Sequence, residues 1–128
     1  MVRTKTPDAL VRDTAVILDV VLENHVLTLR LANISAKPVT NVRVKFNRQI
    51  DGIGGRVNIG TLPIFTKLEF LAPGRVIDVP IERAKTFFAN DKAEPLIAHI
   101  HYVDIDGHTK HAEMRHDLTV WRDMPEIG

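Results

Sequence analysis

Strict alternation of apolar and polar side chains in residues 40–47 is the feature that most limits what this chain can fold into. In an extended strand, successive side chains point to opposite faces of the sheet, so this segment has one apolar and one polar face. The two faces are Val42, Val44 and Phe46 against Arg43, Lys45 and Asn47. One buried face and one wet face are typical of an antiparallel sheet that covers a core.

Similar apolar runs, separated by turn residues, recur along the rest of the chain. Residues 82–90 have helical composition and favour a short helix or a helical corner. About seven strands at regular spacing predict an all-β fold, an immunoglobulin-like antiparallel β-sandwich, with a barrel as the main alternative. Besides 40–47, the expected strands are residues 16–22, 26–34, 64–71, 75–81, 96–102 and 108–121, with a short edge strand at 56–59.

The composition narrows the class of protein further. A length of 128 residues with 45% hydrophobic and 26% charged residues is ordinary for one folded domain. We expect a flexible arm at residues 1–13, the sandwich at 14–122 and a tail at 123–128. The chain has no cysteine, which excludes disulfides and thiolate metal sites, and its net charge of +1 creates no strong field toward nucleic acid. We expect neither a signal peptide nor a membrane span, so a free-standing chain would be cytoplasmic by default.

Three stretches carry a resemblance to a known family. Residues 31–44 read Leu-Ala-Asn-Ile-Ser-Ala-Lys-Pro-Val-Thr-Asn-Val-Arg-Val, residues 71–75 read Leu-Ala-Pro-Gly-Arg, and residues 100–107 read Ile-His-Tyr-Val-Asp-Ile-Asp-Gly. Within residues 26–107 this pattern of turns and corners resembles bacterial immunoglobulin-like modules of the cell-adhesion-related (CARDB-like) type. The resemblance implies a sandwich with a non-catalytic role in binding or spacing, and it implies no ligand and no site residues.

The last strongly patterned segment, residues 96–121, predicts a long hairpin around an Asp-Gly turn. A three-residue loop, made of a type I turn closed by glycine in the left-handed region, places His108 opposite Asp104. The same register sets Ile100 opposite Ala112, so that the apolar residues of both strands meet on one face. The polar residues of both strands then share the other face.

This register gathers imidazoles on the polar face. His101 lies opposite His111, and His99 lies opposite Glu113, with opposed β-carbons roughly 4.5–5.5 Å apart. Imidazoles at that spacing are close enough to share zinc or another divalent metal, with ligands drawn from His99, His101, His111 and Glu113. The alternative is a solvated sheet face on which the histidines hold no ligand.

In an immunoglobulin-like sandwich the third strand lies beside the sixth, which brings two more cations to the polar face. This face suits an acidic segment of another protein, and the lack of interleaved aromatic residues does not favour nucleic acid. The expected partner-binding face is Arg43, Lys45, His99, His101, His111 and Arg115.

No catalytic constellation emerges from the motifs, so we do not expect an enzyme. Ser35 is the only serine and lacks a nucleophile elbow, and the glycine-rich residues 52–56 lack the lysine and serine of a phosphate-binding loop. We therefore expect a protein-binding or assembly module that acts through the polar face or an edge strand, by strand addition or homodimerisation. The alternative is a metal-binding sandwich. The phenylalanines are expected to fill the core and its corners: Phe46, Phe65, Phe70, Phe87 and Phe88.

Overall fold

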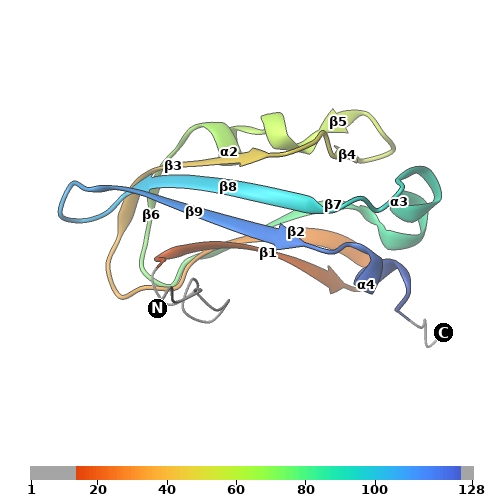
Figure 1. Cartoon of the computed structure of the whole chain (residues 1–128), viewed down its shortest axis with the longest axis horizontal. Helices are drawn as coiled ribbons and strands as arrows, with labels where there is room; N and C mark the ends of the chain where they lie inside the picture. The colour runs from red at the N-terminus through yellow and green to blue at the C-terminus, as the bar shows by residue number, and fades with distance from the viewer. Residues whose placement is uncertain (1–13, 125–128) are drawn as a thin grey trace, which may run out of the picture.

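The computed structural model describes residues 14–124 and shows two antiparallel sheets packed face to face (Figure 1). The expected arm at 1–13 and the last residues of the expected tail, 125–128, lie outside the described residues. The three-stranded sheet has the order β1-β2-β7, formed by Val16–Glu23, Val26–Asn33 and Val76–Arg83. The four-stranded sheet has the order β6-β3-β8-β9, formed by Leu68–Leu71, Val39–Phe46, Leu96–Val103 and Thr109–His116.

Short elements fill the corners between the long strands. β4 (Asp51–Gly52) and β5 (Val57–Asn58) form a small separate hairpin. One 3-10 turn and three short helices complete the described chain: η1 (Ile59–Thr61), α2 (Pro63–Thr66), α3 (Ala84–Asn90) and α4 (Thr119–Arg122). The fold is therefore an all-β antiparallel sandwich, as the sequence predicts, and not a closed barrel.

The core lies between the two sheets and follows the alternation in the sequence. In β8 every second residue is buried, and in β3 the buried residues are Val39, Val42 and Val44, with the alternation shifted at the irregularity between Thr40 and Arg43. Apolar side chains enclosed in this way give about 25 cal/mol per Å² of buried area, the main stabilising contribution to a domain of this size. The largest fully buried side chains are Phe65, Leu18, Leu27, Leu29, Leu31, Ile50, Ile59, Leu71, Ile81, Leu96, Ile100 and Leu118.

The expected strand at residues 64–71 is wrong in its first half. Pro63 occupies the first turn of α2, where its fixed φ and missing N–H fit a helix start, and the strand begins only at Leu68. The expectation for Phe70 is also wrong, because 57% of this residue is exposed. Phe65 and Phe87 are buried, and Phe46 and Phe88 pack against the core, as expected.

The last strand is shorter than expected, because β9 ends at His116 instead of reaching Trp121. Asp117 ends the strand by accepting hydrogen bonds from the N–H and the hydroxyl of Thr119, at 3.0 and 2.6 Å, as α4 begins. The expected helix near residues 82–90 is present as α3, although its first two residues still belong to β7.

The two sheets are joined along one side, where β1 lies next to β9 (Figure 1). The N–H of Leu18 points to Sδ of Met114 at 3.3 Å, and Nε2 of His116 donates to the carbonyl of Leu18 at 2.8 Å. The hydroxyl of Tyr102 accepts from the N–H of Ala15 at 3.0 Å. Side chains of the four-stranded sheet thus contact backbone N–H and C=O groups at β1 that, in an end strand, would otherwise have no hydrogen-bond partner.

On the opposite side, β7 is an end strand that contains a proline. Just before β7, the N–H of Asn33 donates to the carbonyl of Arg75. In an antiparallel pair the backbone groups of successive residues point alternately toward and away from the partner strand, so those of Val76, Asp78 and Pro80 point away from β2. Pro80 has no N–H. Because its backbone points away from β2, the sheet loses no hydrogen bond at this position.

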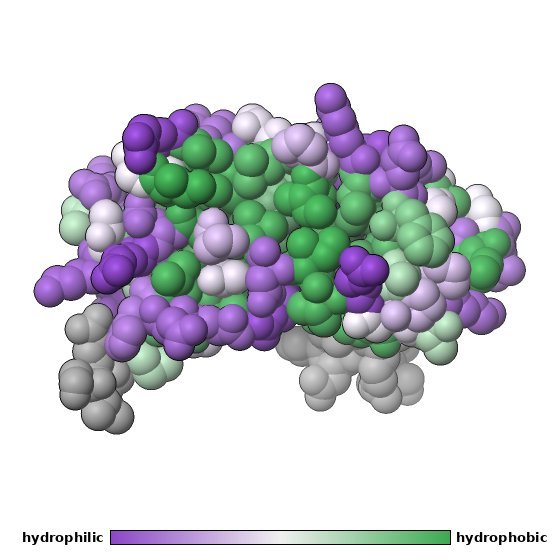
Figure 2. Space-filling model, turned by 180° about the vertical axis from the view of Figure 1, so that it is seen from behind, coloured by the Kyte–Doolittle hydropathy of each residue, from purple (hydrophilic) through white to green (hydrophobic). Residues whose placement is uncertain are grey.

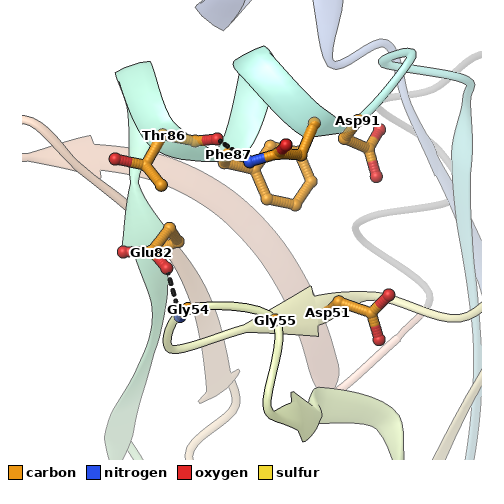
Figure 3. A pocket seen from close by; sticks show the side chains of 8 residues that line it. Asp51, Gly54, Gly55, Glu82, Thr86, Phe87 and Asp91 are labelled. Carbon is orange, nitrogen blue, oxygen red and sulfur yellow. Dashed lines mark hydrogen bonds between the residues drawn. The ribbon is translucent and has the colours of Figure 1, made fainter.

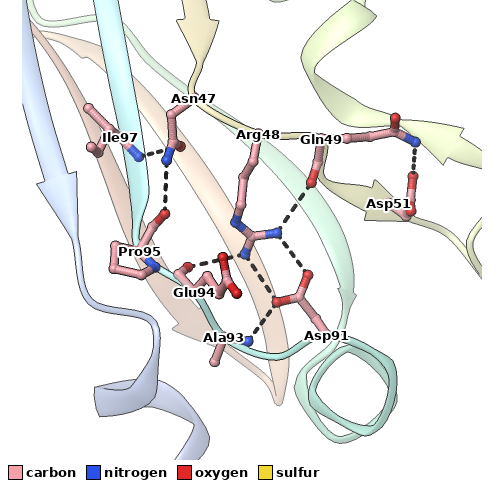
Figure 4. Close-up of polar contacts among 9 residues, drawn as sticks. All are labelled: Asn47, Arg48, Gln49, Asp51, Asp91, Ala93, Glu94, Pro95 and Ile97. Atoms are coloured by element: carbon pink, nitrogen blue, oxygen red, sulfur yellow. Dashed lines mark hydrogen bonds and ion pairs between the residues drawn. The ribbon is translucent and has the colours of Figure 1, made fainter.

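Arg48 holds the corner where α3 passes into β8 (Figure 4). Its two terminal nitrogens bind the carboxylate of Asp91 at 2.9 and 3.1 Å, and one of them also reaches Glu94 O at 3.3 Å. The same carboxylate accepts the N–H of Ala93 at 2.8 Å. Both side chains of the pair are about four-fifths buried, so this bidentate pair acts as an internal brace.

Candidate functional site

The outer face of the four-stranded sheet is the candidate site, because it gathers the basic side chains predicted from the sequence. The register of β8 against β9 is the predicted one, and β3 lies on the other side of β8. Ile97 lies opposite Arg115 at the end of this face. Two rows of opposed residues cross the three strands: Arg43, His101 and His111 in the first, and Lys45, His99 and Glu113 in the second.

The imidazoles of the face stack on one another. The ring centroids of His101 and His111 are 4.6 Å apart at 30°, and those of His99 and His111 are 6.2 Å apart at 8°. Nδ1 of His99 is 3.5 Å from a carboxylate oxygen of Glu113. Partial burial, with the nearby His111, Lys45 and His99, holds the pKa of His101 below its usual value. His101 is therefore neutral at pH 7, and the fixed positive charges come from Arg43, Lys45 and Arg115 of the face.

Phe70 is a member of this face that sequence reasoning missed. It lies opposite Thr40, and Thr40 lies opposite Val103 on the other side. Leu68 and Leu71, on either side of it in β6, are paired with the buried residues of β3, whereas Phe70 is exposed. Its outward position adds one large apolar side chain beside the basic rows. Strict period-two alternation from Leu68 places Phe70 on the buried face, so the sequence pattern carried no signal of its exposure.

The metal hypothesis needs ligand atoms that converge, and the stacked rings do not provide this. Among residues 14–124, His, Asp and Glu ligand atoms within 4.8 Å of one another occur as a group of three at Asp104, Asp106 and His108, not at His99, His101, His111 or Glu113. Imidazole nitrogens coordinate in the plane of the ring, so two rings stacked face to face direct their lone pairs side by side. A shared ion would require at least one ring to rotate.

We therefore expect zinc titration to distinguish the two interpretations of the histidines. Calorimetry with Zn²⁺ should give the same small heat for the wild type and for His101→Ala, because the stacked rings offer no convergent set. A saturable heat in the wild type that His101→Ala abolishes would restore the metal hypothesis.

The carboxylate of Asp104 in the β8–β9 turn is used by the turn itself. Its Oδ1 accepts the N–H groups of Asp106 and His108 at 3.0 and 2.9 Å, and these hydrogen bonds hold the pKa of Asp104 below its usual value. Asp104 N–H donates to His108 O and Gly107 has a φ of +84°, so the loop is the predicted one.

A hollow of about 400 Å³ lies between the β4–β5 hairpin and α3 (Figure 3). Its three carboxylates already have partners: Asp91 binds Arg48, Asp51 accepts from Gln49, and Glu82 accepts the N–H groups of Gly54 and Arg83. Those backbone hydrogen bonds, with that of Gly54 the strongest, lower the pKa of Glu82. The hollow is therefore explained by contacts that fasten the hairpin to β7 and α3.

The side of the molecule turned away from the viewer in Figure 1 carries hydrophobic residues over its centre and hydrophilic ones around them (Figure 2). The more exposed large apolar side chains come from several elements and loops, and they include Ile53, Phe70 and Val76. Within residues 14–124, every helix is too short to span a lipid bilayer.

Fold and site together define a small all-β sandwich domain that carries a basic, histidine-bearing sheet face. By sequence, residues 13–122 match a family model described as a domain of unknown function (DUF8453), and the chain belongs to that family. Comparison with curated proteins gives no significant match. Comparison with solved structures gives none either.

Proposed function

We propose that this domain is a non-catalytic protein-binding module, which docks an acidic segment of a partner protein on the outer face of its four-stranded sheet. The observation that carries the proposal is the charge of the two rows. The rows carry two permanent cations, Arg43 and Lys45, with three imidazoles and a single carboxylate, that of Glu113, and Arg115 adds a third cation at the end of the face. A flat surface with one dominant sign of charge steers and orients an oppositely charged partner.

The assignment to the immunoglobulin-like class belongs to the same proposal. Seven strands in two sheets, with β3 beside β8, agree with it, although β6 lies beside β3 and not beside β7 as in constant-type domains. The corner that resembles cell-adhesion-related modules in sequence has a structural role here. The buried amide of Asn33 donates to Lys37 O and Leu71 O at 2.8 and 3.1 Å, which ties the corner after β2 to the end of β6.

Binding of an acidic peptide tests the proposal. A labelled poly-glutamate peptide of about 20 residues should bind the wild type, and added salt should weaken it because screening acts on exposed charges. The double variant Lys45→Glu/Arg115→Glu should reduce affinity by about tenfold or more, which corresponds to about 1.4 kcal/mol. Fluorescence anisotropy measures both effects.

The matched control is Lys85→Glu, an exposed lysine on α3 outside this face. It should change affinity by less than about twofold, since Lys85 belongs to α3 and adds no charge to the rows of the four-stranded sheet. Equal loss in the control and in the face variant would refute a specific face. No binding at low salt would refute the proposed function.

A further inference from the structure

β9 ends the four-stranded sheet with an open backbone edge. Asp104 N–H donates to His108 O, and Asn47 N–H donates to Ile97 O on the other side of β8. The register of β8 and β9 has no shift, so the backbone N–H and C=O groups of the even-numbered residues of β9 point toward β8. Within residues 14–124, no strand pairs with the backbone groups on the other side: Thr109, His111, Glu113 and Arg115.

The other end strands are less open. Pro80 removes one outward N–H from β7, and β6 is only 4 residues long. In β1, side chains of Met114 and His116 hold the backbone of Leu18. β9 has 8 residues, no proline and no register shift. Proline and short length are two of the devices by which end strands avoid pairing, and β9 lacks both.

The side chains of this edge are complementary to themselves in one register. If two copies of β9 run antiparallel with Ala112 opposite Ala112, His111 of each faces Glu113 of the other, and Thr109 faces Arg115. All of these residues direct their backbone groups to the open edge, so they form hydrogen-bonded pairs. A shift by two residues pairs His111 with itself or Glu113 with itself, and no histidine then faces a carboxylate.

We propose that the β9 edge is an interface for a second copy of this chain, paired antiparallel in the register that sets His111 of each copy opposite Glu113 of the other. The two four-stranded sheets then continue into one. The small side chain of Ala112 lies at the two-fold axis and permits close approach. Each Glu113, already 3.5 Å from His99 of its own strand pair, is placed between two imidazoles. This interface does not depend on peptide binding.

Sedimentation velocity over a range of concentrations tests the interface. The wild type should form a concentration-dependent dimer. Glu113→Lys and His111→Glu should each weaken the dimer by about tenfold, because the first removes the carboxylate that faces His111 twice and the second sets glutamate opposite Glu113 twice. Mixing these two variants should restore the dimer as a heterodimer, since Lys at 113 of one copy then faces Glu at 111 of the other.

The control is Glu69→Lys, an exposed charge reversal on β6 at the far end of the same sheet, which should leave the dimer unchanged. Circular dichroism checks that each variant is folded, and the milder Glu113→Gln should give a smaller loss. A wild type that stays monomeric up to about 1 mM overturns the interface. The interface is also overturned if neither variant changes the dimer affinity, or if the mixed variants associate no more tightly than each variant alone.

Discussion

Replacing Gly52 by alanine should lower the free energy of unfolding by about 3 kcal/mol, the largest effect we expect from a single added methyl group. A β-carbon at this buried position would lie 2.6 Å from the carbonyl oxygen of Ile81 and 2.8 Å from Cδ1 of Ile59. The carbonyl belongs to β7 and accepts the N–H of Ile53, so it cannot move without breaking the contact that fastens the β4–β5 hairpin. Urea denaturation measures the change.

Gly60→Ala is the matched control for this substitution. Its β-carbon would come no closer than 3.3 Å to a side-chain atom of Phe46, which can shift. We expect a change within about 1 kcal/mol, since the lower chain entropy of alanine in the unfolded state offsets a small strain. If both variants lose the same stability, close contact with the β7 backbone is not the cause.

Replacing Arg48 by methionine should lower the free energy of unfolding by about 2–3 kcal/mol. Methionine keeps most of the side-chain length but leaves the carboxylate of Asp91 without its cation at a site about four-fifths buried. The expected loss is below that of a fully buried pair, because one-fifth of each side chain still reaches water. Thermal unfolding should show a midpoint roughly 5–12 °C lower.

A double-mutant cycle separates the pair from the rest of the corner. The variant Arg48→Met/Asp91→Asn should lose less free energy of unfolding than the two single variants together. When both side chains are neutral, no unpaired charge remains at this site. The comparison pair is Arg30–Asp78, also bidentate but more exposed on the outside of the three-stranded sheet. Arg30→Met should cost clearly less than Arg48→Met, and equal costs would contradict the role given to burial.

Sequence reasoning predicted the β8–β9 hairpin correctly because several signals agreed there. The Asp-Gly turn set the loop length, the loop length set the register, and the register brought apolar residues together. The same register correctly placed His101 opposite His111. It could not predict that the rings stack, because ring orientation depends on side-chain torsions that alternation does not determine.

The errors fall where tertiary packing or a local cap competes with the pattern. The apolar run beginning at Ile64 looks like a strand, but Pro63 starts a helical turn and that turn buries Phe65. The run toward Trp121 also looks extended, but the carboxylate of Asp117 accepts hydrogen bonds from Thr119 and turns the chain before α4. In both places a single residue with strong local geometry outweighs several residues with strand propensity.

The proline in β7 limits how native chains can stack into fibres. A growing cross-β filament needs an unbroken row of N–H donors on its exposed flank, and Pro80 interrupts that row. A head-to-tail ribbon through β7 is therefore disfavoured at its first step. Crowded solutions of the folded protein should resist open-ended polymerisation along this flank.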